Sequence, residues 1–203
     1  MSFLFPSPTI TFEAALRDVA SGSPKARTLA AQALGDATDP AEKRRALDAL
    51  IRALSDDVPG VRMEACGALG ELREPGAVPH LIKRLDDGVA AVRQNAAIAL
   101  GTIGHPDGFQ PLADALKDGP PDLRFQAATS LAEIDPARAF DLVLAALDDS
   151  DAQVVGAAAL SVGAIAKLDP ARRRTAIDAL TPRLAQSDAG TRFDVAYAIA
   201  ELG

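Results

Sequence analysis

The chain has 203 residues, of which 48% are hydrophobic, and its formal net charge is −7 at pH 7. No apolar run approaches the roughly 20 residues that a membrane span requires, which argues against a transmembrane protein. Cys66 is the only cysteine, so a disulfide framework is excluded and a reduced, cytoplasmic location fits best. An acidic chain also repels phosphate backbones unless its basic residues gather on one face.

Residues 1–10 are predicted to be a tail that precedes the folded domain. This tail contains Phe3 and Phe5 next to Pro6 and Pro8. It could fold back as an N-terminal cap, dock a partner, or remain disordered. The rest of the chain, residues 11–203, is predicted to be a single repeat domain.

A sequence pattern recurs at a fixed spacing of 31 residues through the middle of the chain. Each copy has Ala at its fifth place, Leu or Val at its ninth and Gly or Ala at its tenth. Four copies begin at Val61, Val92, Leu123 and Val154, and related copies begin at Ala26 and Thr191. A fixed period in this range is typical of a solenoid, in which each repeat packs against its neighbours. We therefore predict six repeats, at about residues 11–36, 37–71, 72–102, 103–133, 134–164 and 165–203.

Each repeat is predicted to contain two helices. Between residues 74 and 101, apolar side chains first recur at the i, i+3, i+4 and i+7 positions of one helical face, and a second, more apolar helix begins near Val92. Asp-Pro pairs at Asp39, Asp135 and Asp169 are predicted to cap the first helices. Pro182 should kink or shorten the first helix of repeat six. The predicted fold is an all-α, right-handed α–α superhelix of about six two-helix repeats.

An Arg column occupies the second place of the pattern. Its members are Arg27, Arg62, Arg93, Arg124 and Arg192. Aspartates recur in the turns before it, among them Asp87, Asp118 and Asp149. Because recurrence at the repeat period is typical of contacts between repeats, we interpret the column as a structural Arg ladder, with contact to a ligand as the alternative. Val155 replaces Arg in repeat five, so the ladder should break there.

Residues 92–106 carry the pattern most completely, with Val92, Arg93, Leu100, Gly104 and Pro106 at characteristic places. This segment resembles the HEAT repeat, and more narrowly the bacterial phycobilisome-lyase-type HEAT-like repeat. The resemblance implies an armadillo-like helical solenoid of bacterial type. Members of the family include chromophore lyase subunits, adaptor proteins and a branch of DNA glycosylases, and most bacterial members resemble scaffolds without chemistry of their own.

The second helices line the concave face in HEAT-like solenoids, and the third, fourth, seventh and eleventh places should point into it. The candidate partner-binding residues there are Met63, Glu64, Gln94, Asn95, Ile98, Phe125, Gln126, Thr129, Leu160, Phe193, Asp194 and Tyr197. An apolar stripe with acidic flanks suits a basic amphipathic helix or an extended peptide. Alternatively, the curvature of the solenoid buries these residues against the first helices of the repeats. Phe193 and Tyr197 at the open C-terminal end could also mediate homo-oligomerisation.

Catalytic and metal-binding patterns are not evident. His80 and His105 lie in different repeats, without zinc-ligand spacing, and no catalytic residue, metal or cofactor is expected. The basic runs at Lys43–Arg45 and Arg172–Arg174 are interpreted as solvated, with anion binding as the alternative.

We predict a non-catalytic scaffold or adaptor that binds a protein or peptide and does not bind a membrane. A bilin-lyase-like or chaperone-like subunit acting with a second subunit is the main alternative. A glycosylase-like DNA-binding protein is disfavoured because the groove is acidic and lacks Trp.

Overall fold

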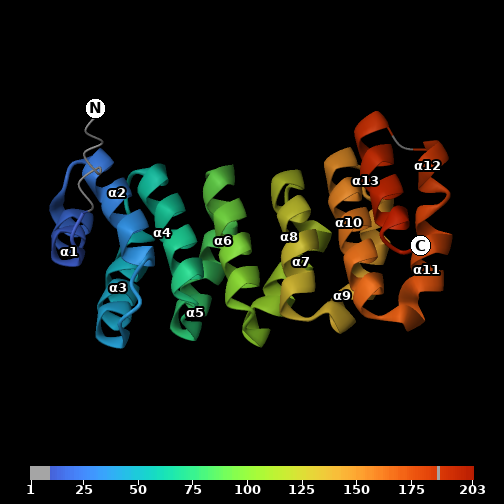
Figure 1. The fold of residues 1–203 in the computed structure, drawn as a ribbon. Coiled ribbons are helices and arrows are strands. Elements are labelled where there is room, and N and C mark those ends of the chain that lie inside the picture. The colour runs from blue at the N-terminus through green and yellow to red at the C-terminus, as the bar shows by residue number, and fades with distance from the viewer. Residues whose placement is uncertain (1–9, 187) are drawn as a thin grey trace, which may run out of the picture.

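The computed structural model describes residues 10–186 and 188–203, which fold into two curved layers of helices (Figure 1). The inner layer contains six helices that carry the repeated pattern. They are α2 (Pro24–Gly35), α4 (Pro59–Leu72), α6 (Ala90–Ile103), α8 (Pro121–Ile134), α10 (Ala152–Leu168) and α13 (Ala189–Ala200). Below, these are the inner helices, and their places are counted from Ala26, Val61, Val92, Leu123, Val154 and Thr191.

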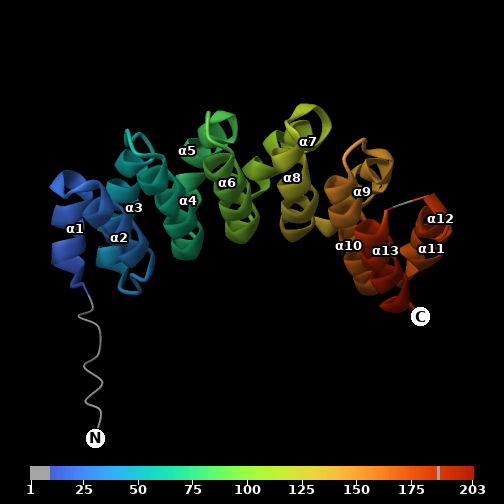
Figure 2. The ribbon, with the colours of Figure 1, turned by 90° about the horizontal axis from the view of Figure 1, so that it is seen from above.

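The outer layer contains the helix that precedes each inner helix, and α1 flanks α2 at the N-terminal end (Figure 2). These elements are α1 (Phe12–Ser21), α3 (Pro40–Ala53), α5 (Val78–Ile82), α7 (Phe109–Asp118), α9 (Pro136–Ala145), α11 (Arg173–Leu180) and α12 (Arg183–Gln186). Short 3₁₀ turns adjoin several of them, at Pro75–Ala77, Lys83–Asp86, Pro106–Gly108, Ala146–Asp148 and Pro170–Arg172.

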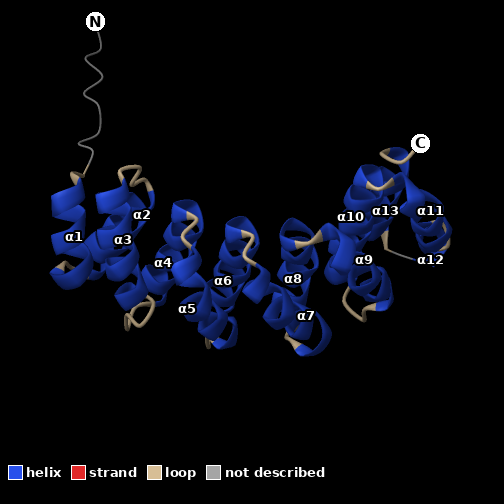
Figure 3. Cartoon of the chain, turned by 90° about the horizontal axis from the view of Figure 1, so that it is seen from below, coloured by secondary structure: helices blue, strands red, loops and turns tan. Residues whose placement is uncertain are grey.

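The layers bend so that the inner helices lie on the concave side of the arc, which Figure 3 shows from the opposite direction. All regular elements among the described residues are helical, so the predicted all-α, right-handed solenoid is confirmed. None of the helices in this part of the chain is long and apolar enough to cross a lipid bilayer. The proposed N-terminal cap or docking segment lies, except for Ile10, outside the described residues.

The boundaries of the outer helices follow from their first residues. The Asp39 carboxylate accepts the backbone N–H groups of Ala41 at 2.8 Å and Glu42 at 3.2 Å, and Asp135 accepts that of Arg138 at 3.1 Å. Both aspartates therefore cap helices whose first residue is proline, as predicted. The interruption at Pro182 is also confirmed, since α11 ends before it and α12 begins after it.

One continuous core runs between the two layers. Its outer side includes one apolar column that is 0% exposed throughout, formed by Leu50, Leu81, Leu112, Val143 and Leu180. Its inner side includes the ninth place of the inner helices, where Leu34, Leu69, Leu100, Leu131 and Val162 are also completely buried. Each repeat contacts only the repeats next to it. The same set of apolar side chains is therefore buried again in every repeat, and the core has no single centre.

Small residues set the spacing between successive inner helices. A Cβ atom added to Gly70 of α4 would lie 3.1 Å from the Cα atom and 3.2 Å from the Cβ atom of Ala99 on α6. Gly35 of α2 is as close to Ala68 of α4, at 3.0 Å. The tenth place of one helix thus contacts the eighth place of the next, and both must be small for the helices to approach this closely.

Candidate functional site

The edge where the inner helices begin is held together by arginines that contact two repeats at once. The Arg62 guanidinium on α4 donates from Nη1 to the Asp56 carbonyl oxygen at 2.8 Å, in the turn of its own repeat. It also donates from Nε and Nη2 to the two carboxylate oxygens of Asp87 in the next repeat, both at 2.9 Å. This arrangement clamps the turns of adjacent repeats together.

Three more arginines of the Arg ladder make equivalent contacts. Their ion pairs join Arg27 to Asp56 at 2.7 Å, Arg93 to Asp122 at 2.8 Å and Arg124 to Asp149 at 2.8 Å. The partner of Arg93 is therefore Asp122 of α8 and not Asp118, which was expected to lie in the turn before the Arg column. The reason is that α7 continues through Asp118, whereas Asp87 and Asp149 follow the end of a helix and are free to point across the repeat boundary.

The ladder is interrupted between α10 and α13. Val155, at the second place of α10, is 8% exposed and has no charge to offer. The repeats are joined there by the Thr191 hydroxyl, which donates to the Ala152 carbonyl oxygen at 3.0 Å, and by an ion pair between Arg183 and Asp148. Arg192, the last member of the column, lies exposed on α13.

The Asp87 carboxylate of the ladder is fully occupied by hydrogen bonds within the chain. Asp87 also accepts the backbone N–H of Val89 at 3.0 Å, and its side chain is only 4% exposed. Hydrogen bonds from Arg62 hold the pKa of Asp87 below its ordinary value, and those from Arg124 do the same for the pKa of Asp149. Asp87 and Asp149 are thus bonded within the chain, which favours a structural role for them over ligand binding.

The twelve candidate partner-binding residues all lie on the inner helices, and they differ in exposure. Four are apolar and exposed, namely Ile98 (42%), Leu160 (37%), Phe193 (72%) and Tyr197 (53%). Met63 and Phe125 are instead partly buried and pack against the core. Both occupy the third place, which lies beside the following inner helix, whereas Ile98, Leu160 and Tyr197 occupy the seventh. The apolar surface is thus narrower than the sequence pattern suggested.

The polar candidates are half-buried, and several are bonded within their own helix. Asn95 Nδ2 donates to the Ala91 carbonyl oxygen at 2.8 Å, and Gln126 Nε2 donates to Thr129 Oγ1 at 3.0 Å. Glu64 and Gln94 are also half-buried. These contacts restrict the conformations of the polar side chains on the inner helices.

Two carboxylates of the concave face lie over glycines of the preceding helix. A Cβ atom on Gly101 would lie 2.6 Å from Oε2 of Glu133, and one on Gly156 would lie 2.5 Å from Oδ2 of Asp194. Burial raises the pKa of Glu133, and the positive charge of Arg73 opposes that rise. The position of Arg73 near Glu133 could not be predicted from helical phase. Arg73 follows the end of α4 and has a left-handed backbone conformation with φ 54°.

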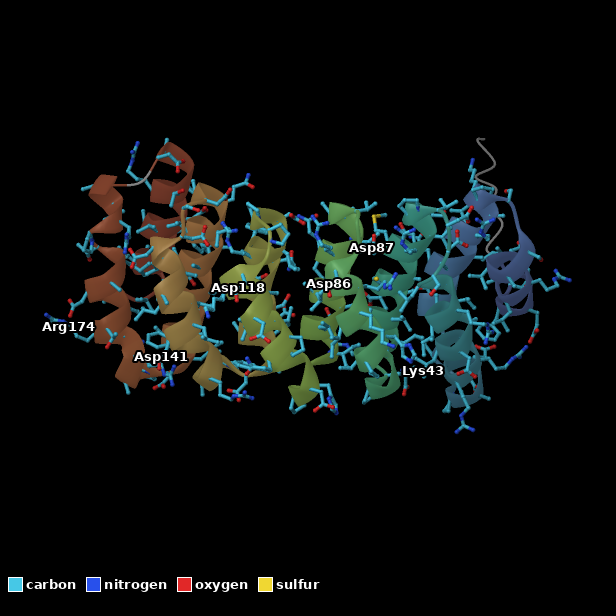
Figure 4. The ribbon with its side chains drawn as sticks, turned by 180° about the vertical axis from the view of Figure 1, so that it is seen from behind. Lys43, Asp86, Asp87, Asp118, Asp141 and Arg174 are labelled. Carbon is cyan, nitrogen blue, oxygen red and sulfur yellow. The ribbon has the colours of Figure 1, made fainter. Side chains whose placement is uncertain are left out.

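The two basic runs are largely occupied by contacts within the chain. Arg45 lies over the ring of Phe12 at 5.3 Å and Arg172 over the ring of Phe140 at 4.6 Å. Lys43 Nζ donates to the Leu72 carbonyl oxygen at 3.2 Å. Figure 4 shows Lys43 and Arg174, one from each run, toward opposite ends of the molecule. The runs therefore do not form a shared anion site, and they stabilise contacts between repeats.

Cys66, His80 and His105 lie in three different repeats of the described chain. No group of His, Cys, Asp and Glu side chains there could hold a metal ion. Burial raises the pKa of Cys66 to about 12, so its sulfur is a neutral thiol and a poor nucleophile. His80 and His105 lie in separate repeats, and His105 Nδ1 accepts the backbone N–H of Asp107 at 3.3 Å.

Known proteins resemble this chain in sequence pattern and in fold. The model of the family described as HEAT repeats matches residues 12–92 and 81–163, more than half of the chain. No curated protein is similar enough in sequence to count as a match.

Several solved structures have a similar arrangement of helices. A designed armadillo repeat protein in complex with the peptide (KR)4 has 18% identity and a TM-score of 0.59, and the match covers 97% of this chain and 100% of that chain. The complex of CpcE and CpcF of phycocyanin lyase from Nostoc sp. PCC7120 has 20% identity and a TM-score of 0.53, with 100% of both chains covered. The YibA protein of Escherichia coli has 19% identity and a TM-score of 0.57 over 94% of this chain and 81% of that chain. At these identities, the likeness shows the fold alone.

Proposed function

Because the chain belongs to the HEAT-repeat family, we propose that it is a non-catalytic scaffold that binds another protein along its concave face. One observation carries this proposal. The seventh place of three inner helices holds a large apolar side chain that remains exposed, namely Ile98, Leu160 and Tyr197. Large exposed apolar residues aligned on one surface are typical of a binding site for another protein.

The position of these residues suits an elongated partner. Each belongs to a different repeat, so a segment that contacts all of them must cross α6, α8, α10 and α13. Thr129 occupies the seventh place of α8, between Ile98 and Leu160. An extended peptide advances by about 3.3 Å per residue, and inner helices are separated by about 8–10 Å, so roughly one side chain in three would meet a new repeat.

The charge of the groove favours a basic partner. Glu64, Glu71, Glu133 and Asp194 belong to the inner helices, at places that face the concave side, and the whole chain has a net charge of −7. The likeness to a designed repeat protein that holds the peptide (KR)4 supports the same chemistry. We therefore expect a Lys- or Arg-containing segment with apolar side chains interspersed.

The experiment compares the chain with a double variant, Ile98→Lys and Leu160→Lys. Binding of fluorescently labelled (KR)4, and of a peptide that alternates Lys with Leu, would be measured by fluorescence anisotropy. The matched control is Leu142→Lys on α9, since Leu142 is similarly exposed (36%) but lies in the outer layer. We expect the double variant to lose at least about tenfold in affinity for the Lys-Leu peptide and the control to keep it. Equal binding by all three proteins would contradict the proposal.

A lyase-like subunit is the second candidate, favoured by the likeness to the CpcE and CpcF complex. In that case the purified chain, mixed with a free bilin and a candidate second subunit, should shift the absorbance spectrum of the bilin. An unchanged spectrum in the presence of that subunit would remove this candidate. The scaffold proposal does not depend on this result.

A further inference from the structure

Asp118 occupies the sequence position of a ladder carboxylate but takes no part in the ladder. In three other repeats, the aspartate five residues before the first place is Asp56, Asp87 or Asp149. Each of these three ladder aspartates is paired with an arginine, and its side chain is 11% exposed or less. Asp118 lies five residues before Leu123, yet it is exposed, and its carboxylate has no hydrogen bond or ion pair to any described residue.

Pro120 removes the bond that holds the other ladder aspartates in place. Each of the three accepts the backbone N–H of the residue two positions later, at 2.9, 3.0 and 2.8 Å. The residue two positions after Asp118 is Pro120, which has no N–H to donate. Asp118 is therefore not fixed in the turn, and Asp122 replaces it as the partner of Arg93. The Asp118 carboxylate is left without a structural role.

A cleft of about 570 Å³ opens beside Asp118, between α7 and the outer element of the preceding repeat. Its apolar lining consists of Ile82, Leu85, Pro111, Ala115 and Leu123. Three exposed carboxylates also line it, those of Asp86, Asp114 and Asp118. Figure 4 shows Asp86 and Asp118 at about the same height on neighbouring outer elements. The cleft formed by these residues is called the α5–α7 cleft below.

The lining of the α5–α7 cleft carries an excess of negative charge. Arg93 is the only basic residue among the described residues that line it, and its guanidinium is already paired with Asp122 at 2.8 Å. Asp114 accepts a hydrogen bond at 2.9 Å from the Gln110 amide, which is neutral. The cleft between α7 and α9 differs, because it also contains the exposed Lys117. The α5–α7 cleft thus combines an apolar surface with uncompensated carboxylates.

We propose that the α5–α7 cleft binds a lysine side chain of a partner protein. The aliphatic stem of the lysine lies on the apolar lining, and its ammonium group lies among Asp86, Asp114 and Asp118. An ammonium group has three N–H donors and can therefore contact more than one of these carboxylates. The cleft belongs to the outer layer, so this site is separate from the concave face and goes beyond the proposed scaffold function.

The first test compares two double variants that have the same net charge. Asp86→Asn with Asp118→Asn removes two carboxylates of the cleft, whereas Asp48→Asn with Asp141→Asn removes two exposed carboxylates from α3 and α9. Fluorescence anisotropy measures the affinity for a labelled peptide that alternates Lys with Ala. We expect the cleft variant to lose at least about fivefold and the control less than about twofold. No binding to the cleft, seen as equal affinities or equal losses in the two variants, would overturn the proposal.

Binding at the concave face is removed from this comparison. All proteins of the first test also carry Ile98→Lys and Leu160→Lys, the two changes that test the scaffold function. Any peptide that these proteins still bind is held elsewhere. A scaffold function that fails its own test therefore leaves the result for the cleft unchanged, and a cleft that binds no lysine leaves the scaffold function unchanged.

The second test concerns the apolar lining of the cleft. A peptide with 2,4-diaminobutyric acid in place of lysine keeps an ammonium group but has a stem shorter by two methylene groups. Because the stem lies on apolar side chains, we expect this peptide to bind at least about threefold more weakly at about pH 6, where both amines are charged. In the cleft variant, the two peptides should bind alike. Equal affinity of both peptides for the chain with an intact cleft would mean that charge alone attracts them, and would reject the lysine site.

Discussion

Arg62 and Asp87 are joined by two parallel hydrogen bonds, both 2.9 Å long, although they belong to different repeats. A bidentate pair of this kind fixes both the distance and the angle between its partners. It therefore sets the stacking of α4 on the following repeat, and with it the shape of the concave face.

Replacement of Arg62 should destabilise the chain measurably. In Arg62→Ala, the largely buried Asp87 carboxylate keeps Arg84 at 3.4 Å but loses its bidentate partner. Hydrogen bonds to charged groups contribute about 1.5–3 kcal/mol each, so we expect the free energy of unfolding in urea to fall by about 2–3 kcal/mol. Arg52→Ala, on the exposed side of α3, is the control and should change it by less than about 0.5 kcal/mol. Equal losses would show that the ladder does not hold the repeats together.

Stability should depend on pH through the same aspartates. The pKa values of Asp87 and Asp149 are lowered by hydrogen bonds from Arg62 and Arg124, so the folded state binds protons less readily than the unfolded state. Their contribution is fully present above the ordinary aspartate pKa of about 3.9 and is lost as pH falls through the lowered values. Urea midpoints from pH 7 to pH 2 should decline mainly below about pH 4, and less steeply in Arg62→Ala. A parallel decline in both proteins would contradict this origin.

Two glycines of α4 should respond oppositely to the same substitution. Gly70→Ala places a Cβ atom 3.1 Å from the backbone of Ala99, and a buried neighbour on another helix cannot yield without moving α6. We expect a loss of about 1–2 kcal/mol in unfolding free energy. Gly67→Ala meets only Asn95 Oδ1 at 3.8 Å and should gain up to about 1 kcal/mol from helix propensity. Thermal melting of both variants checks this, and a gain for Gly70→Ala would refute the close-contact argument.

Binding of a basic peptide should weaken in mild acid because of Glu133. Burial raises the pKa of this carboxylate, so it becomes neutral at a higher pH than the ordinary glutamate value of about 4.3. A neutral Glu133 no longer attracts a cation, and the affinity for (KR)4 should fall as pH falls through the raised pKa. Glu133→Gln should bind more weakly at pH 7 and show a smaller dependence on pH. An identical pH dependence of affinity in the two proteins would mean that the basic side chains of the peptide do not bind near Glu133.

Cys66 should report on the separation of the inner helices. Its side chain is buried, and burial raises the pKa of the thiol to about 12, so native protein should react with iodoacetamide far more slowly than unfolded protein. Mass spectrometry after timed labelling, without and with urea, measures the difference. Rapid labelling without urea would mean that α4 and the following repeat separate readily in the native state.

The repeat period and apolar phase were sufficient to predict the secondary structure and the solenoid. Leu69, Leu100 and Leu131 recur at one place because each fills the same position between layers, and all are completely buried. Asp39 and Pro182 predicted the start and the end of helices for local reasons, namely capping and the missing N–H of proline. Such features depend only on residues a few positions away in the chain, and they can therefore be predicted from the sequence.

Exposure along the concave face was decided by the tertiary structure. Met63 and Phe125 are partly buried, while Phe193 at the same place of α13 is exposed, because a following inner helix covers the first two and not the third. Asp118 was expected in a turn but ends α7, and Arg93 pairs with Asp122 instead. The sequence by itself determined what is periodic, since periodic positions share one local environment. Only the tertiary structure decided the curvature, the helix ends and the exposure of the third place of each inner helix, because these depend on contacts between residues about 30 positions apart.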